Sequence, residues 1–189
     1  MNLTRTARAL VAVLALGIAA CGGGSSTTPS SDAASSSAKF NDADVEFLKM
    51  MVPHHEQALV LSDIALDPTR GASQAIVDLA TQIKAAQAPE IELMASLLDS
   101  WGKQLDEHAM HKSDDDMGMV SDDEIDELST LSGVDFDTAW AKAMLGHHRG
   151  AVAMAEDVLS NGANREVMDL ARAIIATQNA EIAVLEPLS

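Results

Sequence analysis

The stretch MLGHHRGAVAMAEDVL, residues 144–159, has a near twin in MVPHHEQALVLSDIAL, residues 51–66. Each stretch places two adjacent histidines among apolar residues that recur at the spacing of one helix face. A shift of 93 positions, the difference between 147 and 54, superposes Asp44, Met51, His54, His55 and Ala58 on Asp137, Met144, His147, His148 and Ala151. The sequence therefore predicts two copies of one helical unit, each carrying a histidine pair.

The segments that follow these two stretches are repeated as well, at a shift of 91 positions, the difference between 178 and 87. DLATQIKAAQAPEIELM, residues 78–94, and DLARAIIATQNAEIAVL, residues 169–185, share Asp-Leu-Ala, an isoleucine, a glutamine and Glu-Ile in register. Two helical hairpins packed about a pseudo-twofold axis make a four-helix bundle. We therefore predict an all-α fold, a four-helix bundle built from two duplicated helical hairpins.

Caps and apolar periodicity predict where the helices begin and end. Four long helices are expected at about 42–67, 73–101, 135–161 and 164–187, the third capped by Asp135. A capping box at Ser121 predicts a short helix between the second and third that closes at Gly133. We assign residues 40–189 to the bundle and residues 103–134 to an insert between its two hairpins, and roughly 150 residues suffice for one buried core.

The N-terminus indicates an export segment. Arg5 and Arg8 precede the apolar run ALVAVLALGIAA, which is too short to span a bilayer. Small residues then lead into Cys21, the only cysteine, as in the lipobox of bacterial lipoproteins. We expect residues 1–20 to be a lipoprotein signal peptide and 21–39 to be a lipidated cysteine with a flexible Gly/Ser tether. The alternative is a signal peptide that ends near a cysteine by chance.

Composition narrows the class of partner. The formal net charge is −17, and loss of Arg5 and Arg8 with the signal peptide takes it to about −19. Such a chain repels nucleic acid and anionic lipid surfaces and attracts cations. We therefore expect an extracytoplasmic protein that is held to the cell membrane only by its N-terminal lipid. With 3% aromatic and 47% hydrophobic residues, the chain favours helices packed on helices.

The histidine pairs are the main candidate metal site, because helical spacing places them on the core face together with methionines. The candidate ligands are Met51, His54, His55, Met144, His147, His148 and Met154. The partner helices add polar residues to an apolar seam, at Gln87, Glu90, Gln178 and Glu181. We predict a polar layer across the bundle. The alternative is a layer of hydrogen-bonded core histidines that sets the bundle register without metal.

The ligand types favour copper first and zinc second. Di-iron sites in four-helix bundles use Glu-x-x-His pairs and zinc proteases use His-Glu-x-x-His, and neither pattern occurs in the sequence. Imidazole together with thioether suits a borderline or soft metal. Pro53 and Gly146 directly precede the two pairs. We expect a locally opened helical turn there, which would let two adjacent imidazoles point toward one site.

The insert contains the remaining two histidines, in EHAMHKSDDDMGM, residues 107–119. The secondary candidate ligands are His108, Met110, His111, Met117 and Met119. Thioethers bind Cu(I) and imidazoles bind Cu(II), while the neighbouring aspartates attract cations. The alternative is an acidic linker in which histidine and methionine are incidental.

These features predict an exported, lipid-anchored protein that binds or sequesters copper through duplicated Met-x-x-His-His motifs. The alternative, of a different class, is a metal-free structural or partner-binding lipoprotein with an unknown protein partner. An enzyme is not favoured, because the sequence shows no recognisable nucleophile, cofactor motif or acid–base pair.

GMVSDDEIDELSTLSGVDFDTAWAKAMLGHHRGAVAMAEDVL, together with DVEFLKMMVPHHEQALVLSDIAL and the two Gln-x-x-Glu-Ile helices, resembles the bacterial family catalogued as domain of unknown function 305. The resemblance covers about residues 41–188, and its doubled His-His motifs are specific. It implies a ferritin-like four-helix bundle that is often exported, with some members associated with copper handling. It implies no catalytic reaction.

Overall fold

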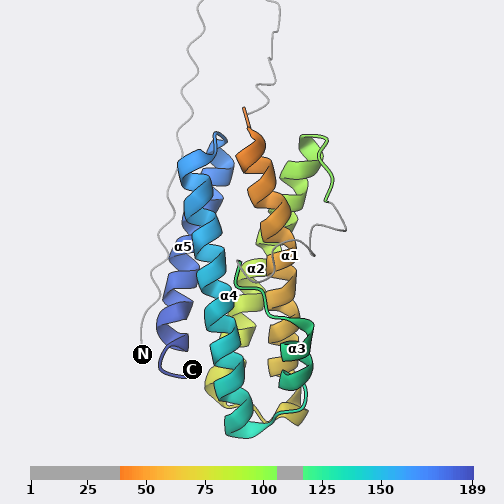
Figure 1. Ribbon diagram of the computed structural model, residues 1–189, viewed down its shortest axis with the longest axis vertical. Helices are drawn as coiled ribbons and strands as arrows, with labels where there is room; N and C mark the ends of the chain where they lie inside the picture. Colours follow the sequence, from red (N-terminus) through yellow and green to blue (C-terminus); the bar gives the residue numbers. More distant parts are fainter. Residues whose placement is uncertain (1–38, 106–116) are drawn as a thin grey trace, which may run out of the picture. The chain divides into compact units, whose positions relative to one another are not determined.

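The computed structural model describes residues 39–105 and 117–189 of the chain. These residues form helices and connecting segments, and no strand occurs among them. The helices are α1 (Asp42–Leu66), the one-turn 3₁₀ helix η1 (Pro68–Arg70), α2 (Gln74–Ser100), α3 (Asp122–Leu128), α4 (Gly133–Asn161) and α5 (Arg165–Leu185). Four long helices with a short helix in the insert confirm the predicted all-α four-helix bundle (Figure 1).

Each half of the bundle is a helical hairpin, and the two hairpins pack against each other through their first helices. α1 packs along α2, α4 packs along α5, and α1 contacts α4. In Figure 1, α1 runs downward from its first residues while α4 runs upward, so these two helices are antiparallel. A twofold axis perpendicular to the helices produces this arrangement. Equivalent residues of α1 and α4 therefore meet only where that axis passes.

Side-chain caps place most helix starts where the sequence predicted them. Asn41 forms a capping box with Asp44 at the start of α1, and Ser121 forms another at the start of α3. Asn164 caps α5 by accepting hydrogen bonds from two backbone N–H groups of the first turn.

α4 begins at Gly133, two residues before the predicted cap at Asp135. Asp135 instead lies in the first turn of the helix, where a negative charge interacts favourably with the helix dipole. The predicted cap was therefore wrong by less than one turn, and the bundle position of the helix is unaffected.

Two duplicated aspartates connect the hairpins. Asp44 on α1 is 0% exposed and accepts hydrogen bonds at 3.1–3.2 Å from the backbone N–H groups of Ala163 and Asn164, just before α5. Asp137, its equivalent on α4, accepts from the backbone N–H of Ser73 at 3.1 and 3.2 Å, just before α2. Each aspartate thus holds the start of the second helix of the other hairpin, which is the symmetry that the repeat predicts.

A layer of buried polar residues divides the apolar core into two clusters. One cluster includes Phe47 and Val158, from the first half of α1 and the last half of α4. The other includes Leu61 and Trp140, from the opposite halves of the same helices. Trp140 is fully buried and donates its indole N–H to the Leu61 carbonyl at 2.8 Å. Buried histidine, glutamine and glutamate side chains lie between the two clusters.

The expected signal peptide, Cys21 and the tether as far as residue 38 lie outside the described residues. None of the helices within residues 39–105 and 117–189 is long and apolar enough to cross a membrane. The boundaries expected for the signal peptide, the tether and the insert stay predictions.

Candidate metal centre

The four paired histidines meet where α1 crosses α4, and each of them is 0% exposed. The rings of His54 and His147 lie with their centroids 3.7 Å apart and their planes inclined by 32°. Because these two residues are equivalent in the internal repeat, their contact marks the pseudo-twofold axis of the bundle. His55 and His148 lie further out, with ring centroids 6.4 and 6.3 Å from those of their chain neighbours.

The two histidines of a pair contact different neighbouring helices. Successive residues of a helix are rotated by roughly 100°, so His54 faces α4 while His55 faces α2. His55 Nε2 lies 2.9 Å from a carboxylate oxygen of Glu90 on α2. In the other half, His148 Nε2 lies 2.7 Å from Glu181 on α5. One ring of each pair therefore contacts the opposite hairpin, and the other contacts its own hairpin.

The locally opened turns expected beside the histidine pairs are not found in α1 or α4. α1 is continuous α-helix with Pro53 inside it, and α4 is continuous through Gly146. That expectation was wrong, because a helix covered by neighbours on two sides has a buried stripe wide enough for two adjacent side chains. No backbone distortion is needed to bury both rings.

Hydrogen bonds determine which ring nitrogen carries the proton in three of the four histidines. His54 Nε2 lies 3.1 Å from the carbonyl oxygen of Met117, which can only accept, so Nε2 is the donor and Nδ1 has a lone pair. A carboxylate likewise accepts from Nε2 of His55 and of His148. Among the described residues, none of the three Nδ1 atoms has a hydrogen-bond partner. Metal-binding histidines usually have this arrangement, with the second ring nitrogen donating to a carboxylate or carbonyl.

His147 differs, because neither of its ring nitrogens makes a well-formed hydrogen bond with a described residue, although the backbone of His54 lies close enough to oppose the lowering of its pKa in part. The side-chain amides of Gln87 and Gln178 also lack partners there, although each residue is only 2% exposed. Leaving a buried polar group unpaired costs about 1–3 kcal/mol. Several unpaired donors and acceptors therefore lie in one layer. This is expected of a site whose hydrogen bonds or coordination are completed by a ligand, and not of a layer selected only for stability.

The two central rings are neutral at neutral pH. Burial, followed by the charge of neighbouring His55, lowers the pKa of His54 from 6.5 to about 3, and the bond to Met117 opposes this only in part. Burial also lowers the pKa of His147 well below 6.5, with His54 and His148 adding to the effect. Because neutral imidazole is the form that binds metal, both rings are available as ligands.

Residues 117–120, which we call the strap, bind across α1 beside the histidines. The Met117 carbonyl accepts the His54 N–H described above. The Gln57 side chain donates to the Val120 carbonyl at 2.7 Å and accepts from the Val120 N–H at 2.8 Å. The strap is therefore attached to α1 at two successive turns, one of which carries a candidate ligand.

Gly150 on α4 and Gly118 in the strap allow the strap to approach α4 closely. A Cβ atom added at Gly150 would lie 1.7 Å from the Met117 carbonyl oxygen, and one added at Gly118 would lie 2.4 Å from the Gly146 carbonyl oxygen. Gly118 also has a φ of +71°, which favours glycine. Only a residue without a side chain fits at these two positions while the strap is in place.

The duplicated methionines lie on opposite sides of the histidine layer. Met51 and Met154 belong to one apolar cluster, and Met144 belongs to the other. Met51 and Met144 each lie three residues before the first histidine of their pair. Because α1 and α4 are antiparallel, this step leads toward opposite ends of the bundle. The seven candidate ligands therefore do not converge on one point, whereas the four imidazoles do form one layer.

No three His, Cys, Asp or Glu side chains within residues 39–105 and 117–189 are grouped so that they could hold one metal ion. Zinc sites normally use three or four such protein ligands. His54 and His147 offer two imidazoles, so further ligands would come from amide oxygens, thioethers or movement of the outer histidines. A site with few hard ligands suits copper better than zinc.

The secondary candidates in the insert are only partly described. His108, Met110 and His111 lie outside the described residues. Met117 and Met119 are half-buried in the strap. The strap therefore connects the expected metal-binding insert directly to the histidine layer.

Sequence reasoning missed the Met117 carbonyl and the Gln57 side chain as contributors to the site. A backbone carbonyl leaves no signal in a sequence. Gln57 lies two residues after His55, and only the position of the strap gives it a function.

Comparison with known proteins gives a consistent group of relatives. The chain matches the family model for Domain of unknown function (DUF305) over residues 44–189. A DUF305 fragment from Deinococcus radiodurans is 34% identical with a TM-score of 0.72, over 78% of this chain and 95% of that chain. A DUF305 protein from Streptomyces coelicolor, predicted to be secreted, is 30% identical with a TM-score of 0.69, over 77% of this chain and 91% of that chain.

Solved structures of CopM are also similar to this chain. CopM in the Cu(II)-bound form is 28% identical with a TM-score of 0.67, over 76% of this chain and 93% of that chain. The same protein has been solved in Cu(I)-bound and silver-bound forms. A comparison with curated proteins gives no match.

Proposed function

Because the chain belongs to the DUF305 family, we propose that it is an exported, lipid-anchored protein that binds copper in its buried histidine layer. The observation that carries this proposal is the set of three Nδ1 atoms without hydrogen-bond partners, on rings whose Nε2 atoms donate to a carboxylate or a carbonyl. Similar CopM structures with bound copper and silver support the same class of ligand.

The side chains of the layer have different tasks in this proposal. His54 and His147 bind the ion first, because both rings are kept neutral by burial and lie beside each other. Imidazole binds a metal through the in-plane lone pair of a ring nitrogen, so the two adjacent rings would rotate to share one ion. Glu90 and Glu181 orient the outer rings of His55 and His148 as further ligands or supports. The methionines of the repeat, Met51 and Met144, together with Met154, surround the layer with polarizable sulfur rather than forming a single shell around it.

Export and anchoring rest on the N-terminal sequence and on one relative. The signal-like run that ends at Cys21 would be cleaved so that the cysteine carries lipid. A similar protein from Streptomyces coelicolor is predicted to be secreted. Metabolic labelling with a fatty acid tests the anchor, and the label should disappear in a Cys21→Ser variant.

Calorimetric titration of the full chain with Cu(II), with Cu(I) under reductant and with Zn(II) tests the copper site. We expect Cu(II) binding, and one equivalent of bound Cu(I), to be lost in a His54→Ala, His147→Ala variant whose helical circular dichroism is unchanged. The matched control is His108→Ala, His111→Ala, which removes the same number of imidazoles from the insert. If the control loses the binding and the first variant keeps it, the ion is held by the insert and not by the layer.

A second candidate function, a metal-free layer that sets the bundle register, is favoured by the two histidine–glutamate bonds. Such bonds are also what a purely structural network would use. The two functions differ in one measurement. A structural layer predicts that His54→Ala and His147→Ala lower the melting temperature equally with and without copper, whereas a copper site predicts a larger loss when copper is present.

A further inference from the structure

A cavity of about 440 Å³ lies between the first half of α1 and the last half of α4. Three methionines from three separate segments line it, Met50 on α1, Met154 on α4 and Met117 at the start of the strap. Glu46 and Asp157 line it as well. Met50 and Met117 are half-buried, and Met154 is 9% exposed. Thioethers and carboxylates therefore share one cavity that is in contact with solvent.

The composition of this cavity suits a soft cation. Thioether sulfur selects Cu(I) among the common metal ions. The two carboxylates raise the local concentration of any cation, and among the described residues that line the cavity none is positively charged. Glu46 and Asp157 are both exposed, so their charge also acts on ions that approach from solvent.

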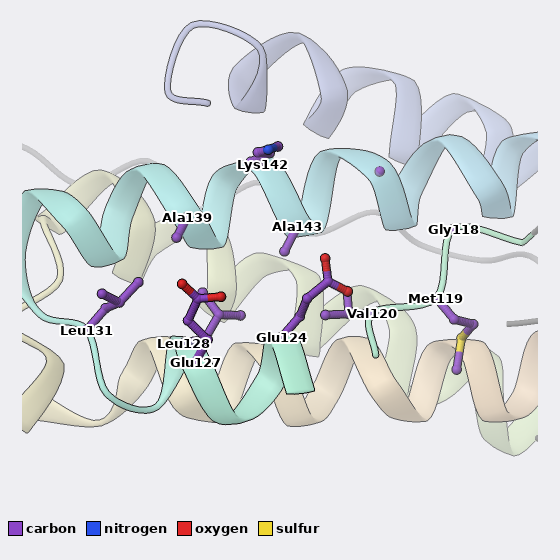
Figure 2. A pocket seen from close by; sticks show the side chains of 11 residues that line it. Gly118, Met119, Val120, Glu124, Glu127, Leu128, Leu131, Ala139, Lys142 and Ala143 are labelled. Atoms are coloured by element: carbon purple, nitrogen blue, oxygen red, sulfur yellow. The ribbon is translucent and has the colours of Figure 1, made fainter. Parts of the chain in front are cut away.

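The internal repeat provides a comparison for these side chains. The residues equivalent to Glu46 and Met50 in the second half are Ala139 and Ala143. Both alanines line a cavity of about 390 Å³ between α4 and α3, toward which they project in Figure 2. In that half of the bundle α3 packs over the equivalent part of the surface, and the two positions equivalent to Glu46 and Met50 carry only alanine side chains. The repeated fold therefore does not require glutamate and methionine at these two positions. Glu46 and Met50 occur only in the half of the bundle that α3 does not cover.

Position along the helices brings this cavity close to the histidine layer. Met50 precedes His54 by four residues, which is a rise of about 6 Å along α1. Met117 contributes to both places, because it lines the cavity and its carbonyl accepts the His54 N–H at 3.1 Å. An ion held by the three sulfurs would lie about one helical turn from the central imidazoles.

We propose that Met50, Met117 and Met154 form a second metal site, a surface thioether site that takes Cu(I). The site does not depend on the imidazoles for its ligands, so it stands whether or not the histidine layer binds copper. It uses Met50, which is not among the candidate ligands that the sequence predicts. Glu46 and Asp157 attract the cation, and the sulfurs select its soft form.

The test is nuclear magnetic resonance of the full chain labelled with ¹³C in the methionine methyl groups, titrated with Ag(I) and, without oxygen, with Cu(I). Ag(I) is a soft cation that does not change oxidation state here. We expect the Met50, Met117 and Met154 methyl signals to shift together, reaching saturation at one ion for the site. A Met50→Leu, Met117→Leu, Met154→Leu variant should lose one equivalent of bound Ag(I) and Cu(I), because leucine keeps the volume and removes the sulfur.

Two further variants make the outcome decisive. Met94→Leu, Met168→Leu is the matched control, since it removes sulfur from the bundle outside the cavity, and it should retain the full stoichiometry. In the His54→Ala, His147→Ala variant the three methyl signals should still shift. The proposal is overturned if the leucine variant binds as many ions as the parent chain, or if the methyl shifts vanish when the histidines are removed. In the second case sulfur and imidazole belong to one site.

Discussion

His147 is expected to favour metal binding while lowering the stability of the metal-free bundle. Its imidazole is fully buried and makes no well-formed hydrogen bond with a described residue, while its neighbour His148 is bonded to Glu181. Two adjacent histidines with the same burial thus have opposite expected effects on stability. Residues retained for a ligand commonly reduce the stability of the ligand-free protein.

Replacing His147 by leucine should raise the free energy of unfolding of the metal-free protein by about 1–2 kcal/mol, because an unpaired buried polar group is removed. Replacing His148 by leucine should lower it by about 1–3 kcal/mol, because the Glu181 carboxylate loses its partner. Urea denaturation of both variants measures the difference. Equal destabilisation by the two substitutions would show that His147 has a hydrogen-bond partner in solution.

Acid should destabilise the metal-free protein through the central histidines. The pKa of His54 is about 3 in the folded chain against 6.5, and that of His147 is also lowered by burial. Below pH 6.5 the unfolded chain therefore binds protons that the folded chain does not. The free energy of unfolding should fall by about 1.4 kcal/mol per pH unit through His54 as the pH drops from 6.5 toward 3, and His147 acts in the same direction.

Unfolding curves measured between pH 7 and about pH 4 test this dependence. The His54→Leu, His147→Leu variant should show a flatter profile than the parent chain. An unchanged slope in that variant would mean that other groups cause the acid sensitivity.

The strap influences the candidate metal site although the histidine ligands lie on other elements, α1 and α4. Its Met117 carbonyl determines the tautomer of His54, and its close approach to α4 depends on the absence of a side chain at Gly150. The sequence predicted a short helix in the insert, which α3 confirms, but not the path of the four residues before it. That path follows from contacts with two helices that are distant in sequence.

A Gly150→Ala variant should displace the strap, because the new Cβ atom would lie 1.7 Å from the Met117 carbonyl oxygen. Loss of the Met117 bond by itself would lower the pKa of His54, but water admitted beside the ring removes the larger effect of burial, so the pKa should rise from about 3 toward 6.5, as followed by nuclear magnetic resonance. Gly146→Ala is the control, since a Cβ atom there meets nothing within 4 Å. An unshifted pKa in Gly150→Ala would mean that the strap does not protect His54.

Across the whole molecule, the duplicated hairpins are joined by symmetric contacts at the ends and in the middle. Asp44 and Asp137 hold the second helix of the opposite hairpin, and the His54–His147 contact lies between them. The antiparallel crossing also separates the core into two apolar clusters on either side of the histidine layer. The bundle is therefore specified by polar contacts as well as by apolar burial.

The two aspartates should contribute unequally, although they are equivalent in the repeat. Asp44 accepts from the backbone N–H groups of Asn41, Ala163 and Asn164 and is 0% exposed, whereas Asp137 accepts from Ser73 and is half-buried. Asp44→Ala should lower the free energy of unfolding by about 2–3 kcal/mol and Asp137→Ala by about 1 kcal/mol. Thermal denaturation of both variants measures this. Equal effects would show that burial of Asp44 adds nothing.

The sequence was enough to predict the helices, the duplication, the bundle class and the placement of His54, His55, His147 and His148 on the core face. These features follow from local helical periodicity and from the comparison of two halves of one chain. The packing of the helices was needed to show that His54 lies against His147, that Met51 and Met144 lie on opposite sides of the layer, and that both helices continue through the histidine pairs. The physical reason is that these depend on the antiparallel crossing of α1 and α4. The convergence of Met50, Met117 and Met154 on one cavity depends on the same crossing and on the path of the strap, and periodicity within a helix carries no information about either.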